Sequence, residues 1–240
     1  MIDPAPLWDF DDPAASEARF RAAAHAAQAG GQNEDGAVLL TQVARALGLQ
    51  ERYDEGHALL DALTPGGPEV STRIALERGR LHRSAGSPDE ARPRFAAAAS
   101  LAAASGLDLL HVDALHMVAL VADPADQLAI NEEALAVARA STDQRAQDWD
   151  ASLFNNIGMV HAAAEDHPAA LAAFEAALTA RERIGDDSRT RVARWMVAWT
   201  LRLLGRADEA LALQRSLKAE LVAAGEDDPY VDEEIALLQG

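Results

Sequence analysis

A weak internal repeat is the feature that most restricts the fold of this sequence. Small residues and large apolar residues recur in the same order at intervals of 35 to 43 residues. The expected starts of successive second helices are Gly56, Ala91, Gln127, Ala170 and Ala210. Repeats of about 20–50 residues are typical of solenoids, in which each unit buries its apolar face only against its neighbours.

The segments between the repeat boundaries have helical patterns. Turn-forming stretches such as "TPGGPE", "AGSPDE" and "GEDDPY" separate runs with apolar residues three and four apart. Ser87-Pro88, Asp123-Pro124 and Asp228-Pro229 each combine a helix-capping residue with proline at the first helical position. Strand patterns are almost absent, so we expect an all-α protein of about twelve helices.

In register, these repeats resemble the tetratricopeptide repeat family. The unit that matches best carries Ile157, Gly158, His161, Ala170, Phe174 and Ala177. Its long form, ending in "ALTARERIG", is similar to the elongated repeats of the kinesin light chain type. The resemblance implies a right-handed α-α superhelix, or solenoid, of about five helical hairpins. An extra N-terminal helix and a C-terminal capping helix are expected to flank them.

Packing explains the repeated residues without the family name. Gly158 and Ala170 allow two helix backbones to approach, and Phe174 fills the space beside them. We therefore predict one repeat domain spanning residues 1–240. Its expected parts are an acidic tail at 1–12, a helix at 13–29, repeats at 37–224 and a capping helix at 229–239. The repeat at 108–134 is the weakest, because Gln127 replaces the small residue.

Composition excludes several classes of partner. The formal net charge of −18 argues against nucleic acid and against anionic membrane surfaces. The absence of cysteine excludes disulfides and thiolate metal sites. The acidic N-terminus has no apolar signal region and no apolar run could span a bilayer, so we expect a cytoplasmic protein.

Motifs of known catalytic or metal sites are not found. Nucleophile elbows, phosphate-binding loops and zinc-binding helices are absent from the sequence. Asp113 and His116 can share a helix face, but a surface pair is the commoner outcome. We therefore predict a non-enzymatic protein with no metal and no cofactor.

The resemblance implies that the first helix of each hairpin lines a concave groove that binds a peptide. The candidate peptide-binding residues are Asn155, Asn156, Arg45, Arg73, Arg80, Arg83, His116, Trp195, Trp199 and Arg202. Several arginines within a strongly acidic chain favour an acidic peptide as the partner. The alternative is that these arginines pair internally with Glu77, Asp113 and neighbouring helices.

Two pairs within this set carry more specific expectations. Asn156 matches an asparagine with which related repeats hold the backbone of an extended peptide, and the alternative is a hydrogen bond to an adjacent helix. Trp195 and Trp199 lie four residues apart and so share one helix face. They form a binding hot spot if they face the groove, or part of the core if the following helices cover them.

The sequence therefore predicts a scaffold that binds another protein or an extended peptide. One alternative is a sensor of a small acidic ligand or signalling peptide. A third possibility is an enzyme or enzyme subunit on a helical-repeat scaffold. The partner's identity and the oligomeric state are left open.

Overall fold

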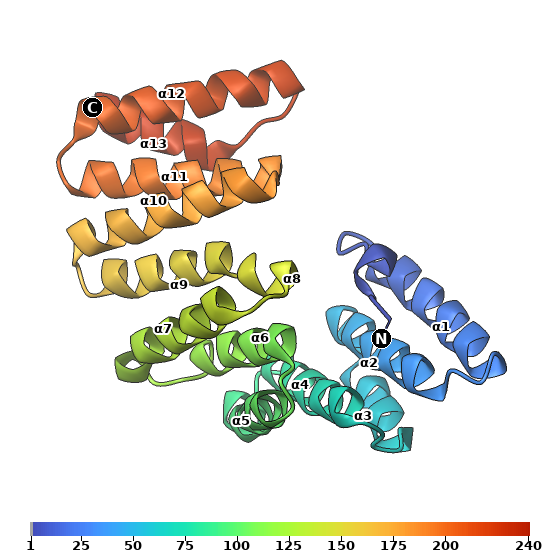
Figure 1. Ribbon diagram of the computed structural model, residues 1–240. Coiled ribbons are helices and arrows are strands. Elements are labelled where there is room, and N and C mark those ends of the chain that lie inside the picture. Colours follow the sequence, from blue (N-terminus) through green and yellow to red (C-terminus); the bar gives the residue numbers. More distant parts are fainter. Residues whose placement is uncertain (1) are drawn as a thin grey trace. The chain divides into compact units, whose positions relative to one another are not determined.

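The computed structural model describes residues 2–240 as a series of α-helices joined by short loops (Figure 1). It contains no strand in these residues, as the sequence predicts. A short 3-10 turn, η1 (Ala5–Leu7), precedes thirteen α-helices in the described residues. No helix of residues 2–240 has both the length and the apolar character needed to cross a bilayer.

The helix bounds follow the predicted hairpins closely. They are α1 (Pro13–Ala29), α2 (Asn33–Leu49), α3 (Tyr53–Ala62), α4 (Pro68–Ser84), α5 (Pro88–Ala104), α6 (Asp108–Ala119), α7 (Pro124–Ala140), α8 (Gln144–Gln147), α9 (Asp150–Ala163), α10 (His167–Ile184), α11 (Asp187–Leu203), α12 (Ala207–Ala224) and α13 (Pro229–Gln239). The single turn of α8 was not expected from the sequence. It lies in the longest of the repeat intervals.

The helices form two compact units, Met1–Asp126 and Gln127–Gly240. The boundary falls in the first turn of α7, so unit 1 contains α1 to α6 and unit 2 contains most of α7 together with α8 to α13. This division lies inside the repeat at 108–134, the one in which Gln127 replaces the small residue.

One packing motif recurs in both units. In unit 2, a Cβ atom added to Gly158 of α9 would lie 2.5 Å from Cε1 of Phe174 in α10, and Phe174 is fully buried. In unit 1, Phe95 of α5 occupies the same place against Gly79 of α4. The absence of a side chain at each glycine lets a buried aromatic ring pack directly on the facing helix backbone.

Helix ends are fixed by local chemistry. The side chain of Asp166 accepts a hydrogen bond from Ala169 N at the start of α10, and that of Asp228 accepts one from Tyr230 N at the start of α13. Gly185 and Gly225 end α10 and α12 in the left-handed conformation, with φ of 81° and 71°. These caps stop each helix where the next one must reverse direction.

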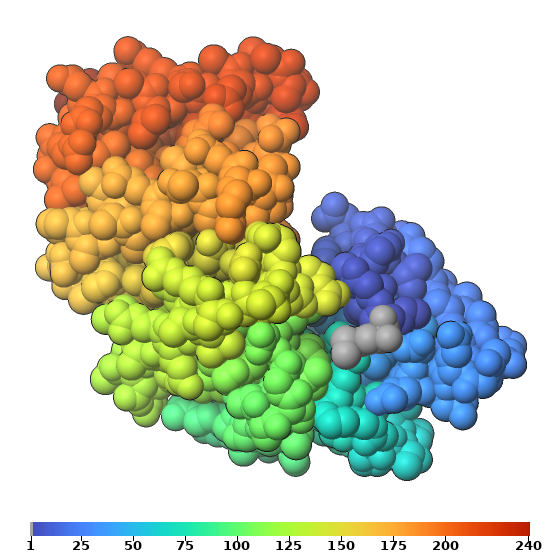
Figure 2. Space-filling view, in the orientation of Figure 1, coloured from blue at the N-terminus to red at the C-terminus, as the bar shows by residue number. Residues whose placement is uncertain are grey.

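The segment before α1 is not a free tail. Trp8 packs on Phe20 with ring centroids 4.9 Å apart, and its Nε1 donates a hydrogen bond to Oε1 of Gln42 at 3.2 Å. The backbone N–H of Ile2 donates to Oδ1 of Asp35. Within unit 1, the segment lies along α1 and α2 (Figures 1 and 2). Its apolar residues Ile2, Leu7 and Trp8 pack against the hydrophobic core of α1 and α2. The acidic composition of the segment did not predict this packing.

Candidate ligand-binding site

Helix α4 carries a buried ionic network in unit 1. Arg73 pairs with Glu69 at 2.9 Å. Arg80 pairs with Glu77 at 2.6 Å and with Asp113 of α6 at 2.5 Å. Arg73 and Arg80, both predicted to bind peptide, are thus engaged within the chain, which is the alternative that the sequence left open.

The network holds its groups in their charged forms. Burial lowers the pKa of Arg80, but Asp113 and Glu77 more than offset this and raise it above its usual range. Burial raises the pKa of Asp113, yet Arg80 and Arg45 hold it below the usual value. Asp113 is therefore a buried partner of Arg80. Its charge also acts on His116, so the pair expected from the sequence is present, but its carboxylate is buried and not at the surface.

Arg45 of α2 differs from the arginines of α4. Its guanidinium lies over the rings of Trp8 and Phe10, at 5.5 and 5.6 Å from their centroids. Among residues 2–240 it makes no hydrogen bond and no ion pair. Burial lowers its pKa and the nearby charge of Arg80 lowers it further, whereas Glu77 and Asp113 oppose this shift. Arg45 is thus a cation covered by two aromatic rings, and it feels Glu77 and Asp113 only at a distance, without a direct ion pair.

Arg45, Arg80 and Arg83 line one pocket of about 200 Å³ in unit 1, with Leu81 and Met117 among its other walls. Arg83 is exposed, and within the described part of the chain it has no carboxylate partner. The pocket thus contains two guanidinium groups, those of Arg45 and Arg83, that form no direct ion pair with a carboxylate of residues 2–240.

The charges of two arginines of this pocket affect the pKa of His116 in α6. It is half-buried, and burial lowers its pKa below the usual value. Asp113 opposes this shift, whereas Arg80 and Arg83 reinforce it. His116 is therefore a neutral imidazole at pH 7, and the positive charge of the pocket comes from its arginines.

In unit 2, the two asparagines of α9 have different surroundings. Nδ2 of Asn156 donates to Oδ1 of Asn131 in α7 at 3.4 Å, and Asn131 in turn donates to the backbone oxygen of Gln127. Asn155 is half-buried and makes no side-chain hydrogen bond within residues 2–240. Asn156, which was expected to contact a ligand, is thus hydrogen-bonded to α7. The amide of Asn155 is available to a ligand.

The tryptophans of α11 share one helix face, as predicted. Trp195 and Trp199 are stacked, with centroids 6.3 Å apart and planes within 8° of parallel. Both are half-buried, and Trp199 also packs edge-on against Phe174. Arg202, the third candidate on this helix, forms two hydrogen bonds of 2.8 Å to the nearly buried Glu234 of α13. The C-terminal helix therefore engages Arg202.

Trp8 and Phe10 were missed by the sequence analysis. A signal was present, because the "LWDF" stretch places two of the chain's eleven aromatic residues together in an otherwise acidic segment.

Within residues 2–240, no group of three or more His, Asp or Glu side chains is arranged to hold a metal ion.

The comparison with protein families supports the repeat assignment. Residues 149–217 match the model of the tetratricopeptide repeat. These residues are tetratricopeptide repeats. They include the hairpin of α9 and α10, in which Gly158 and Phe174 meet, and the resemblance seen in the sequence is confirmed. No curated protein matches the chain significantly.

Solved structures extend the tetratricopeptide-repeat fold to nearly the whole chain. BtubC (BKLC) from P. vanneervenii has a TM-score of 0.67 and 17% identity, with 92% of this chain and 94% of that one covered. A putative kinesin light chain from Podosopora anserina with TPR-like repeats has a TM-score of 0.54 and 14% identity, with 94% and 99% covered. The predicted fold class, an all-α solenoid of helical hairpins, is confirmed.

A third similar structure belongs to a larger protein. It is a signal transduction ATPase with numerous domains from Pyrococcus horikoshii, which has a tetratricopeptide repeat sensor. The TM-score is 0.62 at 12% identity, and the match covers 93% of this chain but only 41% of that one. At these identities the three structures establish the fold.

Proposed function

We propose that this chain is a non-enzymatic scaffold that binds an acidic segment of another protein through Arg45 and Arg83. The observation that carries the proposal is Arg45, a guanidinium covered by two aromatic rings that makes no hydrogen bond and no ion pair among residues 2–240. We further propose that residues 1–240 act as one repeat domain in the cytoplasm.

A carboxylate is the ligand group that fits this pocket best. A guanidinium presents its N–H groups in a planar fork that matches the two oxygens of a carboxylate. The rings of Trp8 and Phe10 hold Arg45 in place before any ligand arrives, which reduces the entropy lost on binding. A bound anion would also relieve the repulsion between Arg45 and Arg80, which lowers the pKa of Arg45.

Of the five arginines predicted to bind a peptide, the proposal keeps only Arg45 and Arg83 as ligand-binding residues. Arg73, Arg80 and Arg202 already have carboxylate partners, so using them for a ligand would break existing ion pairs. In this proposal Arg80 lines the pocket but does not bind the ligand, because Glu77 and Asp113 already offset its charge.

In unit 2, the proposal assigns backbone recognition to the amides of α9. An amide offers one acceptor and two donors to a peptide group. Asn155 is the better placed of the two because its side chain has no partner within residues 2–240, whereas Asn156 bonds to Asn131. Trp199 of α11 supplies aromatic surface for a peptide bound to this unit, whereas Trp195 lines a separate pocket.

Fluorescence anisotropy of a labelled oligo-aspartate peptide tests the arginine pocket. We expect binding that weakens as salt rises past about 0.15 M, where charges are screened beyond about 8 Å. Arg45→Gln and Arg83→Gln should each reduce affinity about tenfold or more, since each removes a charge-assisted hydrogen bond. Arg21→Gln is the matched control, because Arg21 lies on α1 and pairs with Glu17. Affinity that ignores both salt and the pocket variants would reject the proposal.

The same titration separates a peptide from a small ligand. The pocket's volume of about 200 Å³ admits a small dicarboxylate, which is the sensor alternative inferred from the sequence. Succinate that displaces oligo-aspartate at a concentration similar to the peptide's own Kd would favour the sensor. Displacement only at far higher succinate concentrations would favour the peptide scaffold.

A further inference from the structure

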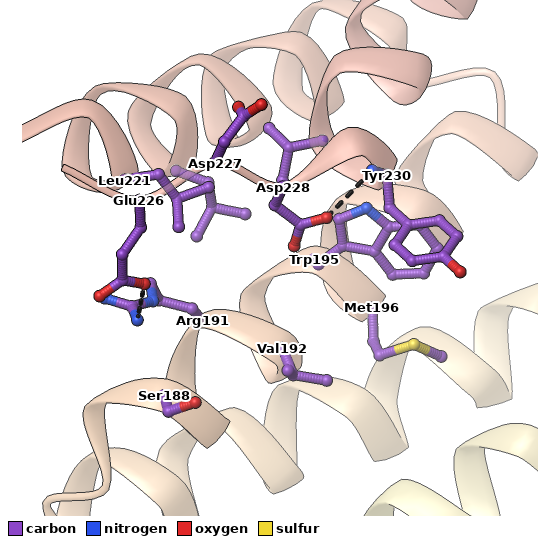
Figure 3. A pocket seen from close by; sticks show the side chains of 12 residues that line it. Ser188, Arg191, Val192, Trp195, Met196, Leu221, Glu226, Asp227, Asp228 and Tyr230 are labelled. Carbon is purple, nitrogen blue, oxygen red and sulfur yellow. Dashed lines mark hydrogen bonds and ion pairs between the residues drawn. The ribbon is translucent and has the colours of Figure 1, made fainter. Parts of the chain in front are cut away.

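Unit 2 contains a second, larger pocket with different chemistry (Figure 3). Its volume is about 580 Å³, within the range of about 300–1,000 Å³ that is usual for ligand sites. Helix α11, the end of α12, the loop at 225–228 and the start of α13 form its walls. The sequence analysis treated α13 only as a cap.

The walls are mostly apolar, and two of their side chains are unusually exposed. Val192 of α11 is 59% exposed and Tyr230 of α13 is 65% exposed. Leu217 and Leu221 of α12 line the pocket from the core. Figure 3 shows Val192 and Met196 along the α11 side, with the pair Arg191–Glu226 at one end and Tyr230 at the other. An apolar groove of this kind is suited to receive an apolar side chain.

Trp195 adds a polar feature to the wall. Its Nε1–H is buried and has no acceptor among residues 2–240, whereas the Nε1–H of Trp8 donates to Gln42. Buried N–H groups are nearly always paired, because an unpaired one costs stability. Because this N–H is covered by the chain itself, an occupant of the pocket contacts the indole ring of Trp195 and not its Nε1.

The rim of the pocket is acidic. Glu226, Asp227 and Asp228 follow one another in the loop before α13. Glu226 pairs with Arg191 at 2.7 Å, whereas Asp227 shares Lys218 with Asp232. The carboxylate of Asp228 caps α13, and it has no cation within the described residues. Carboxylates thus outnumber cations around an apolar pocket.

We propose that this pocket binds a basic peptide segment of a partner protein, anchored by a large apolar side chain. The anchor fills the space between Val192 and Leu221 beside the ring of Trp195, and a neighbouring Lys or Arg meets the carboxylate of Asp228. The acidic rim repels anionic lipid surfaces and a second copy of this chain, whose net charge is −18. This site is opposite in charge to the arginine pocket of unit 1 and is independent of it.

Selection from a phage-displayed library of random short peptides tests the proposal on the full chain. We expect the selected peptides to combine an aromatic or branched apolar residue with Lys or Arg. Val192→Trp should fill the pocket and weaken their binding about tenfold or more, by occlusion of the anchor. Val222→Trp is the matched control, since Val222 is 64% exposed on α12 outside the pocket, and it should leave affinity unchanged.

A second pair of variants isolates the charge. Asp228→Asn removes the carboxylate and keeps a side chain that caps helices equally well, so the fold should persist. We expect binding about threefold weaker and less dependent on salt, because a rim charge is partly screened. Asp208→Asn, at the opposite end of α12, should have no effect. Acidic selected peptides, equal binding to Val192→Trp, or no enrichment over that variant would each overturn the proposal.

Discussion

The hairpins α4–α5 in unit 1 and α9–α10 in unit 2 have the same internal packing and different exposed chemistry. In each, a glycine of the first helix lies against a fully buried phenylalanine of the second. The residue after that glycine is Arg80 in α4 and Met159 in α9. The side chain of Arg80 is only 12% exposed and is paired with two carboxylates, whereas Met159 is 48% exposed and apolar.

This difference separates the residues of a hairpin that packing fixes from the position that can vary. The glycine and the phenylalanine fix how closely the two helices approach, so they are set by packing. The neighbouring position points away from that contact and is free to carry a charge or an apolar group. Hairpins with the same packing can thus carry a buried ion-pair network in one unit and an exposed apolar side chain in the other.

Removing the phenylalanine ring that both hairpins share should have the largest effect on stability, and it tests their common glycine–phenylalanine packing. Phe95→Ala and Phe174→Ala should each lower the free energy of unfolding by about 3–5 kcal/mol, because each leaves a cavity beside a glycine that cannot fill it. Chemical denaturation monitored by circular dichroism measures both. A cost below about 1 kcal/mol in either hairpin would show that its helices are held together elsewhere.

Substituting the residue after each glycine by its counterpart in the other hairpin should affect the stability of the two units very differently. Arg80→Met should lower the free energy of unfolding by about 3 kcal/mol, because Glu77 and Asp113 would be left buried without their cation. Met159→Arg should change it by less than about 0.5 kcal/mol at its exposed site. Similar costs in the two units would contradict the assignment of Arg80 to a buried network.

The pH dependence of stability should reflect the arginine-rich surroundings of His116 in unit 1. Burial lowers its pKa in the folded state, so between the folded and unfolded values the unfolded chain binds more protons. Stability should therefore fall as the pH drops below about 6.5, by less than about 1.4 kcal/mol per pH unit for this group. His57, with a pKa lowered chiefly by burial, should act in the same direction.

Thermal melts at pH 7.5 and 5.5 measure this effect. His116→Gln should reduce the loss of stability at the lower pH, whereas His25→Gln on the exposed side of α1 should not. An unchanged loss in His116→Gln would mean that burial, together with Arg80 and Arg83, does not disfavour the imidazolium of His116.

The smallest effect should distinguish the two asparagines of α9. Asn155→Ala should raise the free energy of unfolding by about 0.6 kcal/mol, because alanine has the higher helix propensity and no hydrogen bond among residues 2–240 is lost. Asn156→Ala gains the same propensity but loses the bond to Asn131, so it should be neutral or slightly destabilising. Thermal melts of both variants decide this, and an equal rise in Tm would return Asn156 to the ligand-binding role predicted from the sequence.

The sequence by itself determined the hairpins and their register. Helix periodicity, proline at first helical positions and the repeated small and aromatic residues depend on neighbours a few positions away, or on one packing rule applied repeatedly. Gly158 with Phe174 was therefore predictable as a helix contact, and so was the shared face of Trp195 and Trp199.

Only the tertiary structure decided which candidate side chains are available to a ligand. Asp113 lies 33 residues from Arg80, and Glu234 lies 32 residues from Arg202, so no local pattern revealed these ion pairs. Arg45 makes no ion pair among residues 2–240, and Trp8 and Phe10, from the segment predicted to be an acidic tail, cover its guanidinium. Charge pairing depends on which helix faces meet, and those contacts form only when the hairpins pack together.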